Sequence, residues 1–141
     1  MRIRPADVTD ADAVFTLLGQ AAEGGADRPV FERNYEQLIA AATYDDTDFL
    51  VADRDGEVVG YVLAARALSL HSGGPVSQLL ELVVDTAHRG QGIGGLLVDA
   101  VIQRARTAGA VEVSVAVRAA RGYYERRGFI TSAACLTLPL T

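Results

Sequence analysis

The stretch from Leu79 to Ala100 constrains the fold of this chain more than any other. It begins with an apolar run, Leu79 to Val84, which is interrupted only by Glu81 and predicts a buried strand. It ends with apolar residues at helical spacing, which predict an amphipathic helix. Between them lies the glycine-rich turn Arg89-Gly90-Gln91-Gly92-Ile93-Gly94-Gly95. Such a turn leaves unpaired amide groups at the positive end of the helix dipole, so we expect a phosphate-binding site here.

Two kinds of phosphate ligand fit this glycine loop. Gly90, Gly92 and Gly95 match the dinucleotide fingerprint G-x-G-x-x-G, and Glu112 follows at roughly the ~20-residue spacing of a ribose-binding acid. The other pattern is an Arg/Gln-x-x-Gly-x-Gly/Ala turn that begins at Arg89. This turn, after a strand that ends Leu-x-Val, resembles the acetyl-CoA pyrophosphate loop of the GCN5-related N-acetyltransferases. A Walker A loop is excluded, because no Gly-Lys-Ser/Thr follows.

The order of the predicted elements favours one of these two ligands. The pattern predicts two helices, the first after the N-cap pair Thr9-Asp10 and ending at Gly24-Gly25, the second opening at Pro29. Three strands follow, at 49–52, 58–64 and 79–84, with a hairpin turn at 53–56 and a loop at 71–75. After the glycine loop and its helix we expect a strand at 111–117, a short helix at 119–127 and an antiparallel segment from Phe129 towards Leu140.

A dinucleotide-binding domain usually places its fingerprint after the first strand and continues with repeated strand–helix–strand units. Here the loop follows two helices and an antiparallel hairpin, and one clear crossover helix comes after it. The order therefore favours the CoA loop. We predict a single domain over residues 1–141, of the α/β (α+β) class, in which helices flank a mixed, mostly antiparallel sheet.

Composition excludes several classes of function. The net charge is −5, and thirteen of the 18 acidic residues precede Val58, which argues against a nucleic-acid partner. No apolar run approaches the length of a membrane span and no signal-peptide core follows Met1, so we expect a cytoplasmic protein without a membrane partner. No Cys/His cluster has zinc-ligand spacing, so no metal site is predicted. Cys135, the one cysteine, is expected in the core.

Nearly the whole chain resembles the GCN5-related N-acetyltransferase (GNAT) family. Its opening, Ile3-Arg4-Pro5-Ala6 and then Asp10-Ala11-Asp12, is similar to the family's first strand and the start of its first helix. The main match runs from Leu82 to Gly94 as LVVDTAHRGQGIG, and the second, Tyr124 to Phe129, is similar to the family's Tyr-x-x-x-Gly-Phe segment. There are two departures: Thr86 stands where proline is frequent, and Val117 where the family often has asparagine near the cofactor.

The resemblance implies an acetyl-CoA-dependent N-acetyltransferase that acts on a primary amine of a small molecule or a peptide, by direct attack in a ternary complex. In the family the pantetheine arm adds to the strand that corresponds to Leu82–Val84, where it splays from the strand 111–117. A backbone N–H near Val84 is the expected oxyanion donor. The resemblance is also compatible with a homodimer. The predicted cofactor-binding residues are Leu82, Val83, Val84, Arg89, Gly90, Gln91, Gly92, Ile93, Gly94 and Gly95.

Amine acetylation by a thioester needs a group that accepts the amine proton and one that protonates the thiolate. Tyr124 matches the family's proton donor, although the adjacent Tyr123 leaves open which ring faces the site. Glu81 is the first candidate for the base, directly or through water, because it is a carboxylate in an apolar strand. Glu112 is the second candidate. The two histidines, His71 and His88, lie in predicted loops and are expected at the surface.

Two other functions stay open at this point. One is a non-catalytic acyl-CoA-binding or sensor protein of the same fold, which would keep the glycine loop and lack a productive base. The other is an NAD-type dinucleotide-binding oxidoreductase. The acetyltransferase is the leading prediction, and no residue pattern identifies its acceptor.

Overall fold

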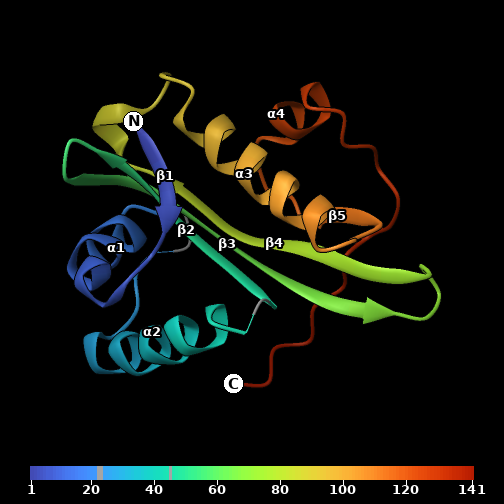
Figure 1. Ribbon diagram of the computed structural model, residues 1–141, viewed down its shortest axis with the longest axis horizontal. Helices are drawn as coiled ribbons and strands as arrows, with labels where there is room; N and C mark the ends of the chain where they lie inside the picture. Colours follow the sequence, from blue (N-terminus) through green and yellow to red (C-terminus); the bar gives the residue numbers. More distant parts are fainter. Residues whose placement is uncertain (22–23, 45) are drawn as a thin grey trace.

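The computed structural model of the chain describes residues 1–21, 24–44 and 46–141. Within them one sheet has the order β1-β2-β3-β4-β5 (Figure 1). The strands are β1 (Arg2–Pro5), β2 (Thr47–Arg54), β3 (Glu57–Ser69), β4 (Gly74–Val84) and β5 (Glu112–Val115). The helices are α1 (Ala11–Gly19), α2 (Arg28–Ala42), α3 (Ile93–Thr107) and α4 (Arg121–Arg126). β1 to β4 pair antiparallel and β5 pairs parallel with β4, which confirms the predicted mixed, mostly antiparallel sheet.

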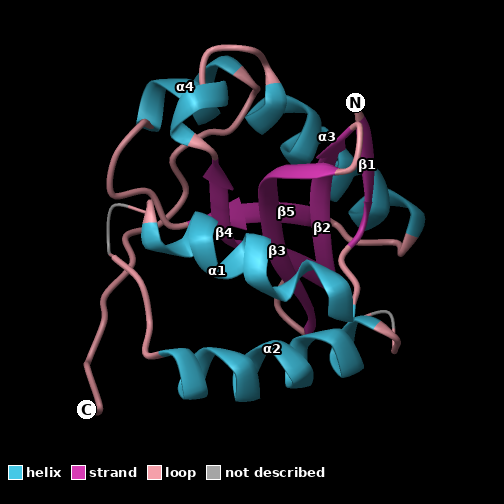
Figure 2. Ribbon diagram, turned by 90° about the vertical axis from the view of Figure 1, so that its left-hand side faces the viewer, coloured by secondary structure: helices cyan, strands magenta, loops and turns pink. Residues whose placement is uncertain are grey.

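Helices cover both faces of the sheet. Helices α1 and α2 lie on one face and α3 on the other (Figure 2). Because side chains alternate along a strand, β2 and β3 contribute to two separate cores, and their central segments, 49–52 and 58–65, are apolar. On the α3 face, Leu97 and Val101 pack with Leu50 and Val62. On the other face, Phe31 and Tyr35 of α2 pack with the sheet.

Two hairpins connect the central strands. Asp55 and Gly56 both have positive φ, +52° and +90°, so the predicted β2–β3 hairpin closes through the two-residue turn that Asp-Gly favours. The β3–β4 hairpin is longer than predicted. Its pairing continues to Ser69 and Gly74, so part of the expected 71–75 loop belongs to β4. The long hairpin carries β4 from its turn to the short 3-10 turn Thr86–His88, which precedes the glycine loop.

Asp10 is the N-cap residue of α1, within the predicted pair Thr9-Asp10, but its side chain makes no capping hydrogen bond to the helix. A short 3-10 turn capped by Asp7 leads into the helix. Asp10 is buried, and its carboxylate accepts two hydrogen bonds from the Arg4 guanidinium, at 2.8 and 2.9 Å. Helix α1 also ends at Gly19, before the predicted stop at Gly24-Gly25.

The prediction of a final strand towards Leu140 was wrong. Residues 129–141 form no helix or strand, and Leu136, Leu138 and Leu140 are exposed. Cys135 is exposed too, rather than part of the core. Alternating apolar residues are compatible with a strand, but a strand also needs a neighbouring edge to pair with, and this segment pairs with none of the described strands. β5 and α4 are likewise shorter than predicted.

Candidate active site

The glycine loop joins the end of β4 to the start of α3. Gly90 and Gly92 have φ of +79° and +81°, a conformation that glycine adopts at no steric cost. A Cβ atom at either position would have no neighbour within 4 Å, so the outer side of the loop is open. Gly92 is the N-cap of α3 and carries no side chain to bond the first-turn amides. The loop thus offers unblocked N–H donors to an anion.

Gly94 and Gly95 serve a different purpose, because α4 approaches α3 at this point. A Cβ at Gly94 would lie 3.2 Å from the Tyr123 hydroxyl, and one at Gly95 would lie 2.9 Å from Nη1 of Arg127. The Arg127 guanidinium donates to the Gly95 carbonyl at 3.0 Å and also binds Asp99. These two glycines therefore allow α4 to dock, a role that the motif alone does not reveal.

The end of β4 has one free side. Val76–Leu79 pair with β5, and that pairing stops before Leu82. The Asp85 amide donates to the Val59 carbonyl. The backbone N–H and C=O of Val83, two residues earlier, therefore also point towards β3. The backbone groups of Leu82 and Val84 consequently point to the opposite side, where β5 has ended. Arg89 confirms this orientation, because its Nε donates to the Val84 carbonyl at 3.2 Å.

A β-bulge decides which way Glu81 points. Leu63 of β3 pairs with Glu81, whereas the next residue, Ala64, pairs with Leu79, so Leu80 is an extra residue in β4. Without the bulge, Leu79 and Glu81 would share a face. With it, Leu79 packs in the core under α3, while Glu81 lies on the α1/α2 face and accepts a hydrogen bond of 2.8 Å from the Tyr61 hydroxyl.

The loop is tied to α1 by a side chain that the sequence patterns did not single out. Nε2 of Gln20 donates to Asp85 at 3.0 Å, and its Oε1 accepts from the Thr86 amide at 2.9 Å. Asp85 also contacts Nδ1 of His88 at 2.6 Å. The hydrogen bonds from His88 and Gln20 lower the pKa of Asp85. No spacing rule could have found Gln20, since its partners are distant in sequence.

Of the two tyrosines of α4, Tyr123 approaches the start of α3. The Tyr123 hydroxyl converges on Gly94 together with the side chains of Leu82 and Val84, and it is buried without a hydrogen-bond partner among the described residues. The ring of Tyr124 packs edge-on against Tyr123 and Phe129. Burial raises the pKa of both phenols. Of the two rings, that of Tyr123 therefore carries its hydroxyl to the end of β4, whereas the ring contacts of Tyr124 are with Tyr123 and Phe129.

Other predicted candidates lie elsewhere. Glu112 opens β5 opposite Val76, and its Oε1 lies 3.4 Å from Oγ of Ser72 at the tip of the β3–β4 hairpin. Leu82 lies six positions further along β4 than Val76, roughly 20 Å of strand. The structure therefore brings Glu81, and not Glu112, next to the free edge of β4. His71 is exposed in the hairpin turn, as expected.

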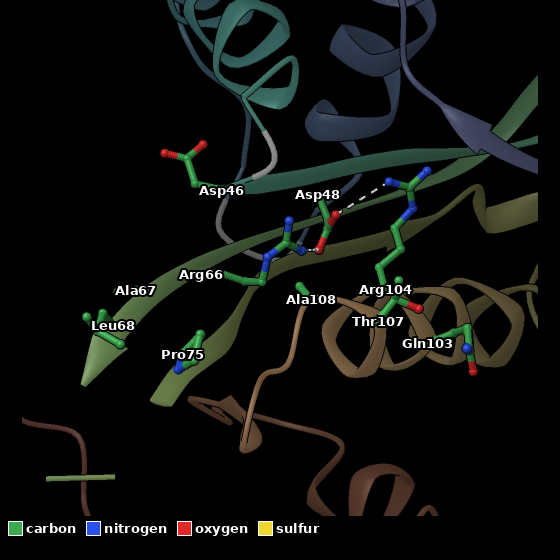
Figure 3. A pocket seen from close by; sticks show the side chains of 10 residues that line it. All are labelled: Asp46, Asp48, Arg66, Ala67, Leu68, Pro75, Gln103, Arg104, Thr107 and Ala108. Carbon is green, nitrogen blue, oxygen red and sulfur yellow. Dashed lines mark hydrogen bonds and ion pairs between the residues drawn. The ribbon is translucent and has the colours of Figure 1, made fainter. Parts of the chain in front are cut away.

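A cavity of about 780 Å³ lies at the opposite end of α3 (Figure 3). Its charged lining includes the buried Asp48, which bonds to Arg66 and lies 3.7 Å from Arg104. Buried charges in proteins are normally paired in this way, and the cluster holds β2 and β3 to the end of the helix. None of the predicted site residues lines this cavity.

None of the described helices combines the length and hydropathy required to cross a bilayer.

Comparison with known proteins agrees with this geometry. The sequence profile of the Acetyltransferase (GNAT) family matches residues 12–129. The chain is 30% identical over 132 residues to the aminoalkylphosphonate N-acetyltransferase of Salmonella typhimurium, covering 90% of this chain and 83% of that protein. It is 29% identical over 136 residues to a probable glucosamine 6-phosphate N-acetyltransferase of Oryza sativa subsp. japonica, covering 92% and 82%.

Solved structures show the same fold. Glucosamine-6-phosphate N-acetyltransferase from Arabidopsis thaliana superposes with a TM-score of 0.84 at 20% identity, over 99% of this chain and 98% of that one. AAC(6')-Iy, in complex with the bisubstrate analogue CoA-S-monomethyl-acetylneamine, superposes with a TM-score of 0.79 at 20% identity, over 99% and 97%. The profile match covers far more than half of the sequence, so this chain belongs to the GNAT family and is an N-acetyltransferase that uses acetyl-CoA.

Proposed function

We propose that this enzyme transfers the acetyl group of acetyl-CoA directly to a primary amine of a small molecule or a peptide, with both substrates bound at once. One observation carries the proposal. The free edge of β4 at Leu82–Val84 leads, through the short 3-10 turn Thr86–His88, into the open glycine loop. A single extended cosubstrate can therefore lie along both features, with its anionic end at the loop and its thioester beside β4.

Each part of this surface fits one part of acetyl-CoA. The amides from Arg89 to Gly95 suit the pyrophosphate, because the loop projects no Cβ at Gly90 or Gly92. The outward backbone groups of Leu82 can bond the amide groups of the pantetheine arm as an added strand would, whereas the Val84 carbonyl already accepts from Arg89. The Val84 N–H then lies where it can donate to the thioester oxygen as negative charge develops there. Most of the rate gain comes from holding the two reactants in attack geometry.

One side chain accepts the proton of the amine, and another donates a proton to the thiolate. The neutral amine nitrogen forms a bond to the thioester carbon, and the carbon–sulfur bond breaks. The proton that the nitrogen loses passes to the Glu81 carboxylate, directly or through water. The CoA thiolate takes the hydroxyl proton of Tyr124, which solvent then replaces. Glu81 lies on β4, one residue before Leu82, and Tyr124 lies on α4 beside Tyr123, whose hydroxyl approaches Gly94 near the side chains of Leu82 and Val84.

The names of two relatives suggest which amines to test first. One acts on aminoalkylphosphonates and the other on glucosamine 6-phosphate, by their names. Both kinds of acceptor combine a primary amine with a phosphorus oxyanion. We therefore place amines of this type at the head of the acceptor series, before unsubstituted polyamines, amino acids, aminoglycosides and peptides.

The test is an acceptor screen with acetyl-CoA. Free thiol release is followed for each amine, and the product is identified by the mass of one added acetyl group. We expect saturable thiol release and an N-acetylated product with at least one class. In parallel, CoA should raise the melting temperature and NAD should not. Stabilisation by NAD alone, or thiol release that never yields an acetylated amine, would overturn the proposal.

A further inference from the structure

The hydroxyl of Tyr61 holds the carboxylate of Glu81. Tyr61 lies on β3 and is 2% exposed, and its hydroxyl donates to Oε1 of Glu81 across the sheet at 2.8 Å. The two residues are not directly paired, since Tyr61 pairs with Val83 and Leu63 pairs with Glu81. The contact therefore runs diagonally on the α1/α2 face. It exists because the bulge at Leu80 turns Glu81 to that face.

The Tyr61 ring is itself held by a row of aromatic side chains. Phe31, Tyr35, Phe49 and Tyr61 follow one another with ring centroids 5.5, 5.5 and 6.0 Å apart. The last two contacts are edge-on, an arrangement that aromatic rings prefer. The row runs from α2 through β2 to β3. A ring packed in this way has little rotational freedom, so the direction of its hydroxyl is set before any substrate binds.

We infer that Tyr61 is a positioning residue, which fixes the Glu81 carboxylate so that Oε2 is the oxygen that receives the proton of the acceptor amine. This inference rests on the proposed function, in which Glu81 is the base. With Oε1 engaged by Tyr61, the carboxylate cannot rotate freely about its last bond. A base held in one orientation needs no reordering at the moment of proton transfer.

The protonation state of Tyr61 suits this task. Burial and the neighbouring Glu81 carboxylate raise the pKa of Tyr61 far above its ordinary value. The phenol therefore stays a neutral O–H donor at every pH at which an enzyme works. A hydroxyl at this depth would also be costly to leave unpaired, so the contact to Glu81 stabilises both side chains.

The test compares two tyrosines of the same aromatic row. Tyr61→Phe removes the hydroxyl that binds Glu81. Tyr35→Phe is the matched control, because Tyr35 is 4% exposed and its hydroxyl donates at 2.6 Å to the carbonyl of Asp7, away from Glu81. We expect Tyr61→Phe to lower kcat by about ten- to a hundredfold with an unchanged KM for acetyl-CoA. Tyr35→Phe should have the kcat of the wild type, even if both variants lose similar amounts of thermal stability.

A double-mutant cycle shows whether Tyr61 acts through Glu81. In a Glu81→Gln background, adding Tyr61→Phe should lower kcat no further. The same fractional loss in both backgrounds, or wild-type kcat in Tyr61→Phe, would overturn the inference. Should Tyr61→Phe fail to fold, Glu81→Asp provides the second variant, since it withdraws the carboxylate from Tyr61 by one methylene. Wild-type kcat in Glu81→Asp would equally contradict the inference.

Failure of the inference differs from failure of the proposed function. If the wild-type enzyme releases thiol but acetylates none of the amines, the proposed function is wrong. If the wild-type enzyme acetylates an amine and Tyr61→Phe does so equally fast, only the role of Tyr61 is wrong.

Discussion

Gln20 and Asp85 are 65 residues apart in the chain, and their side chains are joined by a hydrogen bond of 3.0 Å. Gln20 follows the last residue of α1, and Asp85 follows the last residue of β4. The same side chain also accepts the Thr86 amide. The end of a helix on one face of the sheet is thus fastened to the first residues of the cofactor loop, which fixes the path of the backbone before Arg89.

Loss of this contact should weaken cofactor binding. Gln20→Ala removes two hydrogen bonds that each contribute about 1 kcal/mol. Since the loop then has to be ordered when CoA binds, we expect the Kd for CoA, measured by calorimetry, to rise by about tenfold. Gln37→Ala, at an exposed position on α2, is the control and should leave the Kd unchanged. Equal affinities for the wild type and Gln20→Ala would show that Gln20 does not order the loop.

The left-handed backbone at Gly92 makes a second prediction possible. Gly92→Ala meets no neighbouring atom, so its cost comes from φ of +81° alone and should be about 1–2 kcal/mol in the free energy of unfolding. Gly19→Ala also meets no neighbouring atom, has no positive φ and lies within α1, so it should be neutral or stabilising by up to about 1 kcal/mol. Urea unfolding measures both. A stabilised Gly92→Ala would contradict the loop conformation.

The two tyrosines of α4 should respond in opposite ways. Tyr124→Phe removes the proposed proton donor and should lower kcat by about tenfold or more, with little change in stability. Tyr123→Phe removes a buried hydroxyl that has no partner among the described residues, so it should raise the free energy of unfolding by about 1 kcal/mol. Steady-state kinetics of both variants measures kcat, and urea unfolding measures their free energies of unfolding. Loss of kcat in Tyr123→Phe alone would move the donor role to Tyr123.

The contacts of Asp85 predict a pH dependence of stability. Hydrogen bonds from His88 and then Gln20 lower the pKa of Asp85 below its ordinary value of about 3.9. A lowered folded-state pKa stabilises the protein above the unfolded pKa, and this stabilisation is lost as the pH falls through the folded value. Asp85→Asn should therefore be less stable than the wild type at pH 7, and the gap should shrink below about pH 4. A gap that stays constant in urea unfolding at both pH values would refute this.

Much of the backbone of the proposed cofactor half of the site could be predicted from the sequence. The apolar strand, the glycine turn and the helix stripe around Leu97 are local patterns, and the backbone conformations they favour do not depend on distant partners. The Asp55-Gly56 turn is local in the same sense. These signals were sufficient to indicate both the CoA loop and the mostly antiparallel sheet.

Other features depended on contacts between distant segments. A single extra residue at Leu80 reverses the face of every side chain on one side of it, and no alternation pattern reveals such a bulge. The predicted strand towards Leu140 is absent for a related reason. An alternating pattern shows that a segment could be a strand, but it does not show whether a neighbouring strand is available to pair with it. The sequence by itself therefore determined the conformation of the glycine loop, because it rests on local backbone geometry, while the order of the elements and the family resemblance indicated CoA. Only the tertiary structure decided that Glu81 meets Tyr61 and that Gln20 holds the loop, because these contacts arise when separate strands and helices pack together.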